Sequence, residues 1–240
     1  MSVPKQTRIG WIVPSINVVA EDEAIRMVPE SVGIHFTRAV VDNSLPLEGQ
    51  FAGMIDQLPQ LAHGLSHAKV SVVAFACTSA GFFRGSGGDQ DIITVLGESA
   101  GVPAVTTARA VVDALTQLGA RRVAIATPYV EWVCDAERRF VEAEGFSVTH
   151  IVGMGRSGGS DISGIDAEEV RDLVAAVDSP DADTILISCT DLPTVDLIDE
   201  LEDRHGKPVV TSNQATMWAC RQLADIGPTD GYGALLRSTG

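Results

Sequence analysis

The sequence has few cysteines, and their spacing excludes the most common cysteine-based sites. Cys77, Cys134, Cys189 and Cys220 are spread over 240 residues, and no two of them form a C-x-x-C pair. Zinc sites and redox motifs generally need such close pairs. Disulfides are rare in a reducing compartment. We therefore expect neither a metal site nor a disulfide framework.

Long apolar runs and excess basic charge are also missing. No stretch approaches the ~20 apolar residues of a membrane-spanning helix, and the N-terminal segment lacks the apolar core of a secretory leader. The chain has 17 Lys and Arg against 32 Asp and Glu, a formal net charge of -15. That charge repels nucleic acids and anionic membranes, although local hydrogen-bond donors can still bind a small anion. We expect a cytoplasmic protein that binds neither nucleic acid nor membrane.

Nucleotide-binding motifs are absent as well. The sequence contains neither a phosphate-binding loop nor a dinucleotide fingerprint, which argues against a nucleotide cofactor. The five histidines form no constellation with the cysteines, so a Cys-His dyad is not supported. We therefore expect chemistry that uses no cofactor.

What the chain does have is a regular alternation of apolar runs and helical patterns. Several runs are apolar throughout, which is typical of parallel strands covered on both faces. An α/β fold with doubly wound parallel sheets follows. Asp166 and Glu169 predict a capping box. The expected strands are 8–14, 33–41, 70–77, 103–107, 122–127, 147–152, 184–189 and 208–211, and the expected helices are 50–67, 107–118, 131–144, 167–177, 191–203 and 213–225.

Three segments recur in the same order at a nearly constant offset. Such a series indicates a duplicated unit and predicts two pseudo-symmetric lobes with the active site between them. We assign residues 1–112 with 213–240 to an N-terminal lobe and 113–212 to a C-terminal lobe. The paired segments are RIGWIVP (8–14) with RVAIATP (122–128), ACT (76–78) with SCT (188–190), and GVPAVT (101–106) with GKPVVT (206–211).

Two features of the duplicated architecture stay open. The Gly-rich segment 153–164 is expected to be a loop at the carboxyl end of a strand, where it could act as a lid. A homodimer is compatible with the sequence, but no heptad pattern or apolar patch argues for one.

Cys77 and Cys189 each end a strand of the duplicated unit, and ligands bind outside the carboxyl ends of such strands. The backbone N–H groups that follow can hold a carboxylate or oxyanion and should lower the pKa of a thiol. Two opposed thiols suit proton transfer on two faces, or addition at one carbon with protonation of its neighbour. A strand-end cysteine is more often a small buried hydrophobe. The repetition of Cys-Thr favours function, whereas Cys134 and Cys220 are expected in the core.

Further polar groups follow the first strand of each repeat. Ser15 and Asn17 offer a hydroxyl and an amide, and Tyr129 offers a phenol. Each is more often a turn or cap residue, but their place on the same rim as the cysteines makes them candidate substrate ligands. Thr211 to Asn213 are expected to cap a helix.

The sequence resembles the aspartate/glutamate racemase superfamily, and within it the branch of maleate cis-trans isomerases, arylmalonate decarboxylases and ectoine-utilisation proteins. The resemblance covers most of the chain and implies a two-lobed fold, a small carboxylate substrate and no cofactor. It is specific for the superfamily and less so for the reaction. The matching segments are RIGWIVPS (8–15), ACTS (76–79), FRG (83–85), LGARRV (118–123), TPY (127–129), SCT (188–190), PVVTSNQ (208–214) and GYG (231–233).

The residue at the position of the first cysteine, Cys77, distinguishes the isomerases of that branch from the decarboxylases. The isomerases are similar to this chain in having a cysteine in both lobes, whereas the decarboxylases typically have glycine at the position of Cys77. The resemblance implies that Cys77 is the nucleophile and that Cys189 protonates the adjacent carbon. It also implies carboxylate binding by Asn17, Thr78, Ser79, Tyr129 and Thr190.

Some positions depart from the isomerase pattern. The isomerases have an Asp-Asn pair where this chain has GGSDIS (158–163), and the segments 82–85 and 231–233 look closer to the decarboxylases. The leading hypothesis is a maleate cis-trans isomerase-like enzyme. The alternatives are an arylmalonate decarboxylase-like lyase, an amino-acid racemase and a non-catalytic protein that binds a metabolite.

Overall fold

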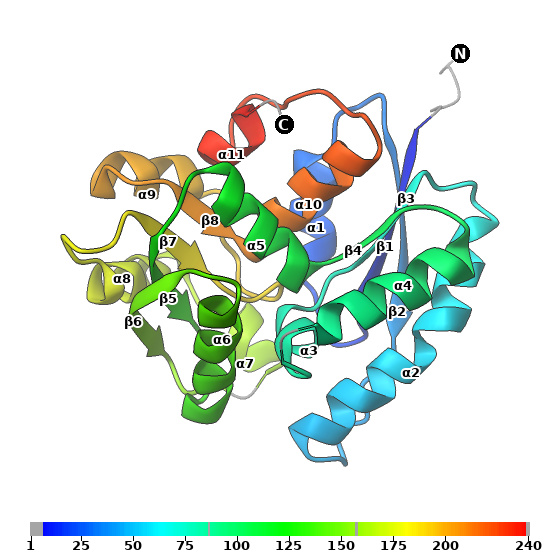
Figure 1. Cartoon of the computed structure of the whole chain (residues 1–240), viewed down its shortest axis with the longest axis horizontal. Coiled ribbons are helices and arrows are strands. Elements are labelled where there is room, and N and C mark those ends of the chain that lie inside the picture. Colours follow the sequence, from blue (N-terminus) through cyan, green and yellow to red (C-terminus); the bar gives the residue numbers. More distant parts are fainter. Residues whose placement is uncertain (1–6, 86, 157, 239–240) are drawn as a thin grey trace.

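The computed structural model describes residues 7–85, 87–156 and 158–238, and its strands form two four-stranded parallel sheets (Figure 1). The first sheet has the order β2-β1-β3-β4 and the second has the order β6-β5-β7-β8. The strands are β1 (Arg8–Pro14), β2 (Gly33–Ala39), β3 (Val72–Phe75), β4 (Ala104–Thr106), β5 (Arg122–Thr127), β6 (Ser147–Gly153), β7 (Thr184–Ile187) and β8 (Val209–Thr211).

The two sheets are built alike. In each, the first strand of the repeat lies between the second and the third, as Ile9 pairs with both Ile34 and Val72. All residues of β3 and β7 are buried, which explains their uninterrupted apolar sequences. The predicted α/β class and its eight strands are confirmed. Because β3 ends at Phe75 and β7 at Ile187, each cysteine lies just beyond its strand.

Helices cover both faces of the sheets, and the predicted ones recur with small shifts. Asp166 caps α8 through the predicted box with Glu169. The sequence analysis did not predict helices at α1, α4, α7 or α11. The helices are α1 (Ala20–Met27), α2 (Leu47–Ser66), α3 (Thr78–Phe82), α4 (Gly88–Ala100), α5 (Thr107–Gln117), α6 (Glu131–Ala143), α7 (Ser160–Ser163), α8 (Ala167–Val177), α9 (Ile198–His205), α10 (Ser212–Leu223) and α11 (Gly233–Arg237).

The predicted helix 191–203 was wrong in its first half. The chain after Cys189 runs through turns, and α9 begins only at Ile198. Pro193 disfavours helical backbone at the residue before it. The Glu23 carboxylate accepts hydrogen bonds from the Thr194 and Val195 N–H groups, which fixes the segment in its turn.

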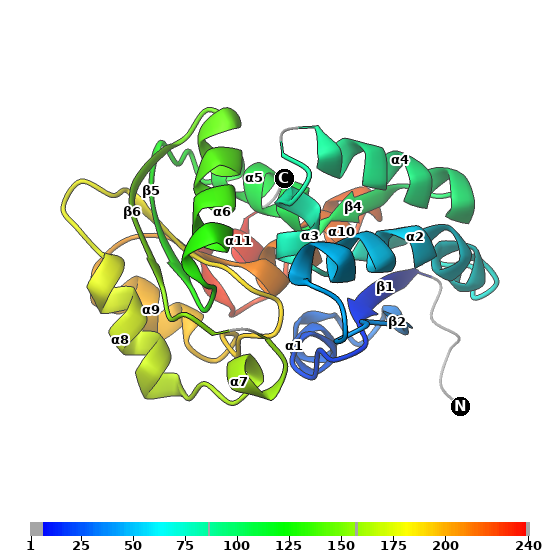
Figure 2. The same ribbon diagram turned by 90° about the horizontal axis from the view of Figure 1, so that it is seen from below.

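The lobes meet along α5 and α10, which pack against each other at the centre of Figure 1. Helix α10 follows β8 of the second sheet but also packs on β3 and β4 of the first. Figure 2 shows α3 between α2 of one lobe and α6 of the other, and α3 contacts both. The lobe boundaries at 112/113 and 212/213 stay predictions.

One apolar core runs through both lobes. Trp11 and Ile125, on the central strands of the two sheets, belong to the same buried cluster. The segment 153–164 combines the end of β6 with the short helix α7, while Ser157 lies outside the described residues. Its role as a lid stays a prediction.

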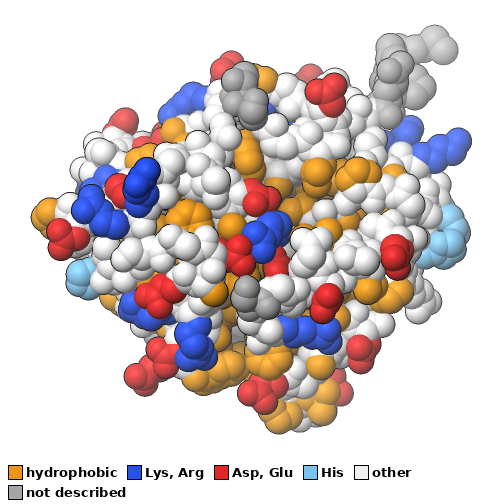
Figure 3. Space-filling model, in the orientation of Figure 1, with side chains coloured by type: hydrophobic (Ala, Val, Ile, Leu, Met, Phe, Trp, Pro, Cys, Tyr) orange, Lys and Arg blue, Asp and Glu red, His pale blue; other side chains and the backbone are white. Residues whose placement is uncertain are grey.

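The surface carries charges of both signs. On the face shown in Figure 3, acidic and basic side chains are interspersed, and no basic patch gathers there. Among the helices in the described ranges, none is both long and apolar enough to cross a membrane.

Candidate active site

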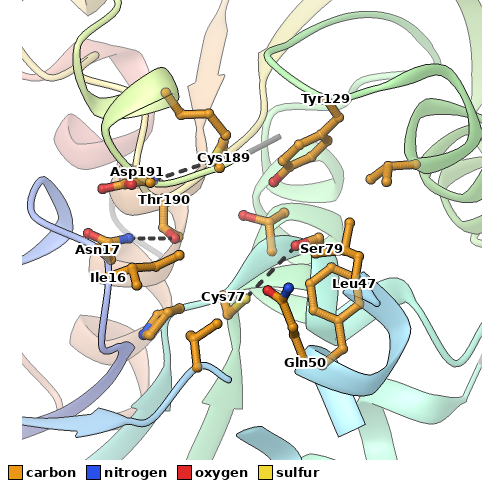
Figure 4. Close-up of a pocket in the computed structure, with 18 of the residues that line it drawn as sticks. Ile16, Asn17, Leu47, Gln50, Cys77, Ser79, Tyr129, Cys189, Thr190 and Asp191 are labelled. Atoms are coloured by element: carbon orange, nitrogen blue, oxygen red, sulfur yellow. Dashed lines mark hydrogen bonds between the residues drawn. The ribbon is translucent and has the colours of Figure 1, made fainter. Parts of the chain in front are cut away.

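A cavity of about 410 Å³ lies between the two lobes, where the strands of both sheets end. Pro14 ends β1 and Tyr129 follows β5, while Cys77 and Cys189 follow β3 and β7. Figure 4 shows the two cysteines on opposite sides of this cavity, with Tyr129 beside Cys189. The duplication therefore brings one thiol from each lobe to a shared space.

The cavity collects most of the residues that the sequence singled out. Ser15 is not among the described residues that line it: its hydroxyl accepts a hydrogen bond from the Val41 N–H at 3.0 Å, and Val41 lines the wall. The predicted residues that do line the cavity are Asn17, Cys77, Thr78, Ser79, Tyr129, Cys189 and Thr190.

Cys77 ends an extended segment and begins a helix. Its φ is -145°, and α3 starts at the next residue. The side chain is buried, and burial raises the pKa of the thiol to about 11 despite hydrogen bonds from Ala80 and Ser79. The expected lowering of the pKa by the helix N-terminus is therefore wrong, because desolvation outweighs what a five-residue helix provides.

Cys189 has a different backbone. Its φ is 138°, a value that residues other than glycine rarely adopt. The Asp191 N–H lies 3.4 Å from Sγ, and the Tyr129 hydroxyl also donates to the sulfur. Burial nevertheless raises the pKa of the thiol to about 12. At neutral pH both cysteines therefore carry a proton.

Tyr129 is held rigidly beside Cys189. Its carbonyl accepts hydrogen bonds from the Gly155 N–H at 3.1 Å and the Cys134 thiol at 3.6 Å. Gly153 lies against that carbonyl so closely that a Cβ there would come within 2.3 Å of the oxygen. Burial raises the pKa of the phenol well above its usual value, so Tyr129 acts as a hydrogen-bond donor and not as an anion.

The threonines after the cysteines connect the lobes. Thr190 donates to the Ala76 carbonyl at 3.1 Å and accepts from Asn17 Nδ2 at the same distance. Thr78 donates to Ser212 Oγ at 2.9 Å. Both hydroxyl protons already have acceptors, which leaves the backbone N–H groups of Thr78 and Ser79 as the donors for a carboxylate. As the first residues of α3, these amides have no intrahelical acceptor.

An apolar wall makes up much of the cavity, and the sequence analysis did not assign it to the site. The sequence analysis predicted only a helix over 50–67, and the first turns of α2 face the cavity. Apolar side chains are buried both in a core and in a cavity wall, so the apolar spacing could not show that these residues face a cavity. The wall consists of Val41, Leu47, Phe51, Met54, Val130, Trp132, Val133 and Ile162.

Two charged residues at the cavity were also missed. Arg156 lies in the Gly-rich segment and is paired with Asp161 at 3.0 Å and Glu169 at 3.1 Å, so two carboxylates already balance its charge. Asp191 accepts a hydrogen bond from the Val18 N–H, and burial raises the pKa of its carboxyl to about 6.

A buried carboxyl lies behind the cavity. Glu137 on α6 is 2% exposed, and burial raises its pKa to about 7, against a smaller opposing effect of the nearby Ser188 hydroxyl. Its Oε2 has no partner among the described residues. Ser188 directly precedes Cys189, so this carboxyl is next to the second cysteine turn.

The other two cysteines are not among the described residues that line the cavity, and the possible metal ligands do not cluster in the described residues. Cys134 and Cys220 are buried, as predicted, and all four cysteines are free. Within residues 7–85, 87–156 and 158–238, no group of three His, Cys, Asp or Glu side chains is placed to hold a metal ion.

Known proteins match the chain along almost its whole length. The profile of the family described as arylmalonate decarboxylase matches residues 9–236. Arylmalonate decarboxylase from Bordetella bronchiseptica is 33% identical over 231 residues, 95% of each chain, and maleate isomerase from Pseudomonas putida is 30% identical over 243 residues, 95% of this chain and 96% of that one. A solved structure of a Cys-to-Ser mutant of Nocardia farcinica maleate cis-trans isomerase, with a covalently bound succinylcysteine intermediate, superposes with a TM-score of 0.90 at 25% identity, covering 98% of this chain and 99% of that one.

Proposed function

The chain belongs to the arylmalonate decarboxylase family, and within it we propose that the protein is a cofactor-independent cis-trans isomerase of a small carboxylate, with maleate as the leading substrate. The observation that carries the proposal is the pair of free cysteines, Cys77 and Cys189, on opposite sides of one cavity. A decarboxylase needs one proton donor, whereas addition to a double bond with protonation of the neighbouring carbon uses two thiols.

The proposed reaction balances within the site. Cys77 passes its proton to a substrate carboxylate, and its sulfur forms a bond to one alkene carbon. The electron pair of the double bond takes the proton of the Cys189 thiol at the other carbon. The new C–C single bond rotates, and the Cys189 thiolate takes a proton from the carbon that it had protonated. The C–S bond then breaks with its electrons returning to the Cys77 sulfur, which recovers its proton from the substrate carboxyl group. The Cys189 thiol carries the proton that this step needs, because burial raises its pKa.

The succinylcysteine found in the Nocardia enzyme supports a covalent route. Succinylcysteine is what addition of a cysteine thiol across the double bond of maleate produces. We assign that bond to Cys77 because the backbone N–H groups of α3 next to it can hold a carboxylate of the substrate. Asn17 and Ser79 are proposed to hold the carboxylates from the other sides of the cavity, and Tyr129 is proposed to join them when its hydroxyl turns from Cys189 Sγ to the substrate.

A second candidate is a decarboxylase of arylmalonates, and the apolar wall favours it. Phe51, Met54 and Trp132 offer a surface for an aromatic ring, which maleate lacks. In that reaction carbon dioxide leaves the malonate and Cys189 alone protonates the resulting enediolate. Cys77 would then be dispensable, which separates the two candidates.

Proton NMR of the purified protein under reducing conditions tests both. With maleate, the isomerase predicts that the vinyl signal of maleate is replaced by that of fumarate. With phenylmalonate, the decarboxylase predicts phenylacetate and carbon dioxide. Conversion of phenylmalonate without any conversion of maleate would overturn the leading proposal.

Cysteine variants sharpen that experiment. Cys77→Ala and Cys189→Ala should each stop isomerisation, and full turnover by either would end the two-thiol proposal. Cys220→Ala is the matched control, because this cysteine is equally buried but lies in α10 away from the cavity. A cytoplasmic location and a homodimer belong to the same proposal, and light scattering tests the dimer.

A further inference from the structure

A single buried hydroxyl connects the two cysteine turns. Ser212 Oγ accepts a hydrogen bond from Thr78 Oγ1 at 2.9 Å and another from the Cys189 N–H at 3.0 Å. Ser212 is 1% exposed and begins α10. Thr78 follows Cys77 directly, so one oxygen atom is bonded to the turn of each lobe.

The Cys189 turn needs such support because its backbone is strained. A φ of 138° at a non-glycine residue persists only where the surroundings fix it. Ser212 holds the N–H of Cys189, and Asn213 Nδ2 holds the Thr190 carbonyl at 3.0 Å. Asn213 is itself bonded to the buried Glu23 carboxylate at 2.7 Å. The start of α10 therefore holds the peptide that precedes Cys189 and the peptide that follows Thr190.

The fold alone does not require this bond. Thr107 is the repeat counterpart of Ser212, since it follows Thr106 as Ser212 follows Thr211. The Thr107 hydroxyl contacts the Phe75 carbonyl at 3.4 Å and Thr216 Oγ1 at 2.7 Å, not the Cys77 backbone. The duplicated position thus holds a cysteine backbone in the second lobe only.

We propose that Ser212 is a positioning residue, which sets the distance and direction between the Cys77 and Cys189 thiols by bonding to both turns. This inference rests on the proposed two-thiol function. Ser212 is not among the described residues that line the cavity, so it acts through Cys189 and Thr78 and not on the substrate. Its loss should lower kcat and leave KM nearly unchanged.

The test compares Ser212→Ala with Thr216→Val. Thr216 lies one turn along α10 and is fully buried, and its hydroxyl bonds to Thr107 on α5 and to the Ser212 backbone carbonyl. Its loss therefore removes a similar hydroxyl but leaves the bonds of the Ser212 side chain to both cysteine turns in place. Because a misplacement of 1 Å can cost about 10²-fold, we expect Ser212→Ala to lower kcat about 10²-fold and Thr216→Val to change it less than about threefold. Ser212→Thr, which has the side chain of its repeat counterpart, should restore most of the activity.

A substrate-independent readout separates this inference from the proposed function. Peptide mass spectrometry after alkylation reports each thiol, and in Ser212→Ala the released turn should expose Cys189, raising its alkylation rate about tenfold relative to Thr216→Val. If the wild type converts neither maleate nor phenylmalonate, the proposed function fails, while this alkylation result still decides the role of Ser212. Equal alkylation and kcat in the two variants would overturn that role. If Ser212→Ala does not fold, kcat of Ser212→Cys against Thr216→Cys decides it in the same way, since sulfur is a weak acceptor.

Discussion

The two cysteine turns come from one repeated unit but have different backbones. Cys77 has an ordinary extended conformation with a φ of -145°, and α3 begins immediately after it. Cys189 has a φ of 138°, and the next helix, α9, begins only at Ile198. The lobes therefore share an architecture, yet only the second stores backbone strain at its thiol.

This difference indicates a division of labour. The Cys77 turn presents free backbone N–H groups from α3, which suits holding an anion beside a nucleophile. In both turns one backbone N–H donates to the sulfur, that of Ala80 to Cys77 and that of Asp191 to Cys189. Only in the second turn does the N–H of the cysteine itself donate to a side chain, that of Ser212. An anchored thiol is suited to delivering a proton from a fixed direction.

The largest expected effect concerns what each cysteine does to maleate. Cys77→Ser should lower turnover at least about 10³-fold, as removal of a nucleophile does, and Cys189→Ser about 10²- to 10⁴-fold, as removal of a general acid does. Intact-protein mass spectrometry distinguishes the two roles. Cys189→Ser should gain the mass of one substrate molecule, and Cys77→Ser should gain none.

The double variant Cys77→Ser/Cys189→Ser controls for addition to other thiols. An adduct on Cys189 in the Cys77→Ser variant would reverse the two roles. An adduct that the double variant also forms would show that the added mass reports neither site.

The next effect concerns the buried carboxyl beside the second turn. Ser188 precedes Cys189 and faces Glu137, whereas Ala76 precedes Cys77 and offers no hydroxyl. The folded-state pKa of Glu137, about 7, lies above its ordinary value of 4.5. The folded protein therefore binds more protons between these values, and Glu137 lowers the free energy of unfolding as pH rises from about 4.5 to about 7, by roughly 3 kcal/mol.

Glu137→Gln tests this prediction, because glutamine has a similar shape and no charge. Urea unfolding gives the free energy of unfolding at pH 4.5 and pH 8. Between these values it should fall less for the variant than for the wild type, so the variant should be more stable relative to the wild type at pH 8 than at pH 4.5. The pKa of Asp191 is also raised, but Asp191 is present in both proteins, so its contribution to the pH dependence of stability cancels in the comparison. A wild-type–variant difference that does not depend on pH would refute the prediction.

Sequence reasoning could predict the sheets and the place of the thiols. Uninterrupted apolar runs determine buried parallel strands, and the repeated Cys-Thr placed both cysteines at strand ends. Local patterns could not show that the two turns differ. The φ of Cys189 results from contacts with Ser212 and Asn213, more than twenty residues away, and the first half of the predicted helix 191–203 failed because Glu23 from the other lobe binds that segment.

The pKa of the thiols was mispredicted for a related reason. The sequence predicts a helix or turn after Cys77, but it does not show that the cysteine is buried between the two lobes. Desolvation depends on the whole fold, whereas a helix N-terminus is a local feature. The apolar wall was missed likewise, since Phe51 and Met54 follow the same spacing as the residues that pack in the core.

The smallest expected effect is the most direct test of the strain. Cys77→Gly should be about 0.5–1 kcal/mol less stable than Cys77→Ala, because glycine loses more backbone entropy on folding and gains nothing at an extended φ. At position 189 the sign should reverse. Alanine retains a conformational penalty of order 1–3 kcal/mol at a φ of 138°, which glycine does not have, so Cys189→Gly should be about 1 kcal/mol more stable than Cys189→Ala.

Comparing glycine with alanine at each site removes the contribution of the sulfur, since both variants lack it. Unfolding midpoints and slopes in urea for the four variants give the two differences directly. Opposite signs would establish that the strain belongs to the second turn. If glycine is the less stable residue at both positions, the Cys189 turn relaxes when its thiol is removed, and the strain would then come from the contacts of Sγ with Asp191 and Tyr129 and not from the bonds of the backbone to α10.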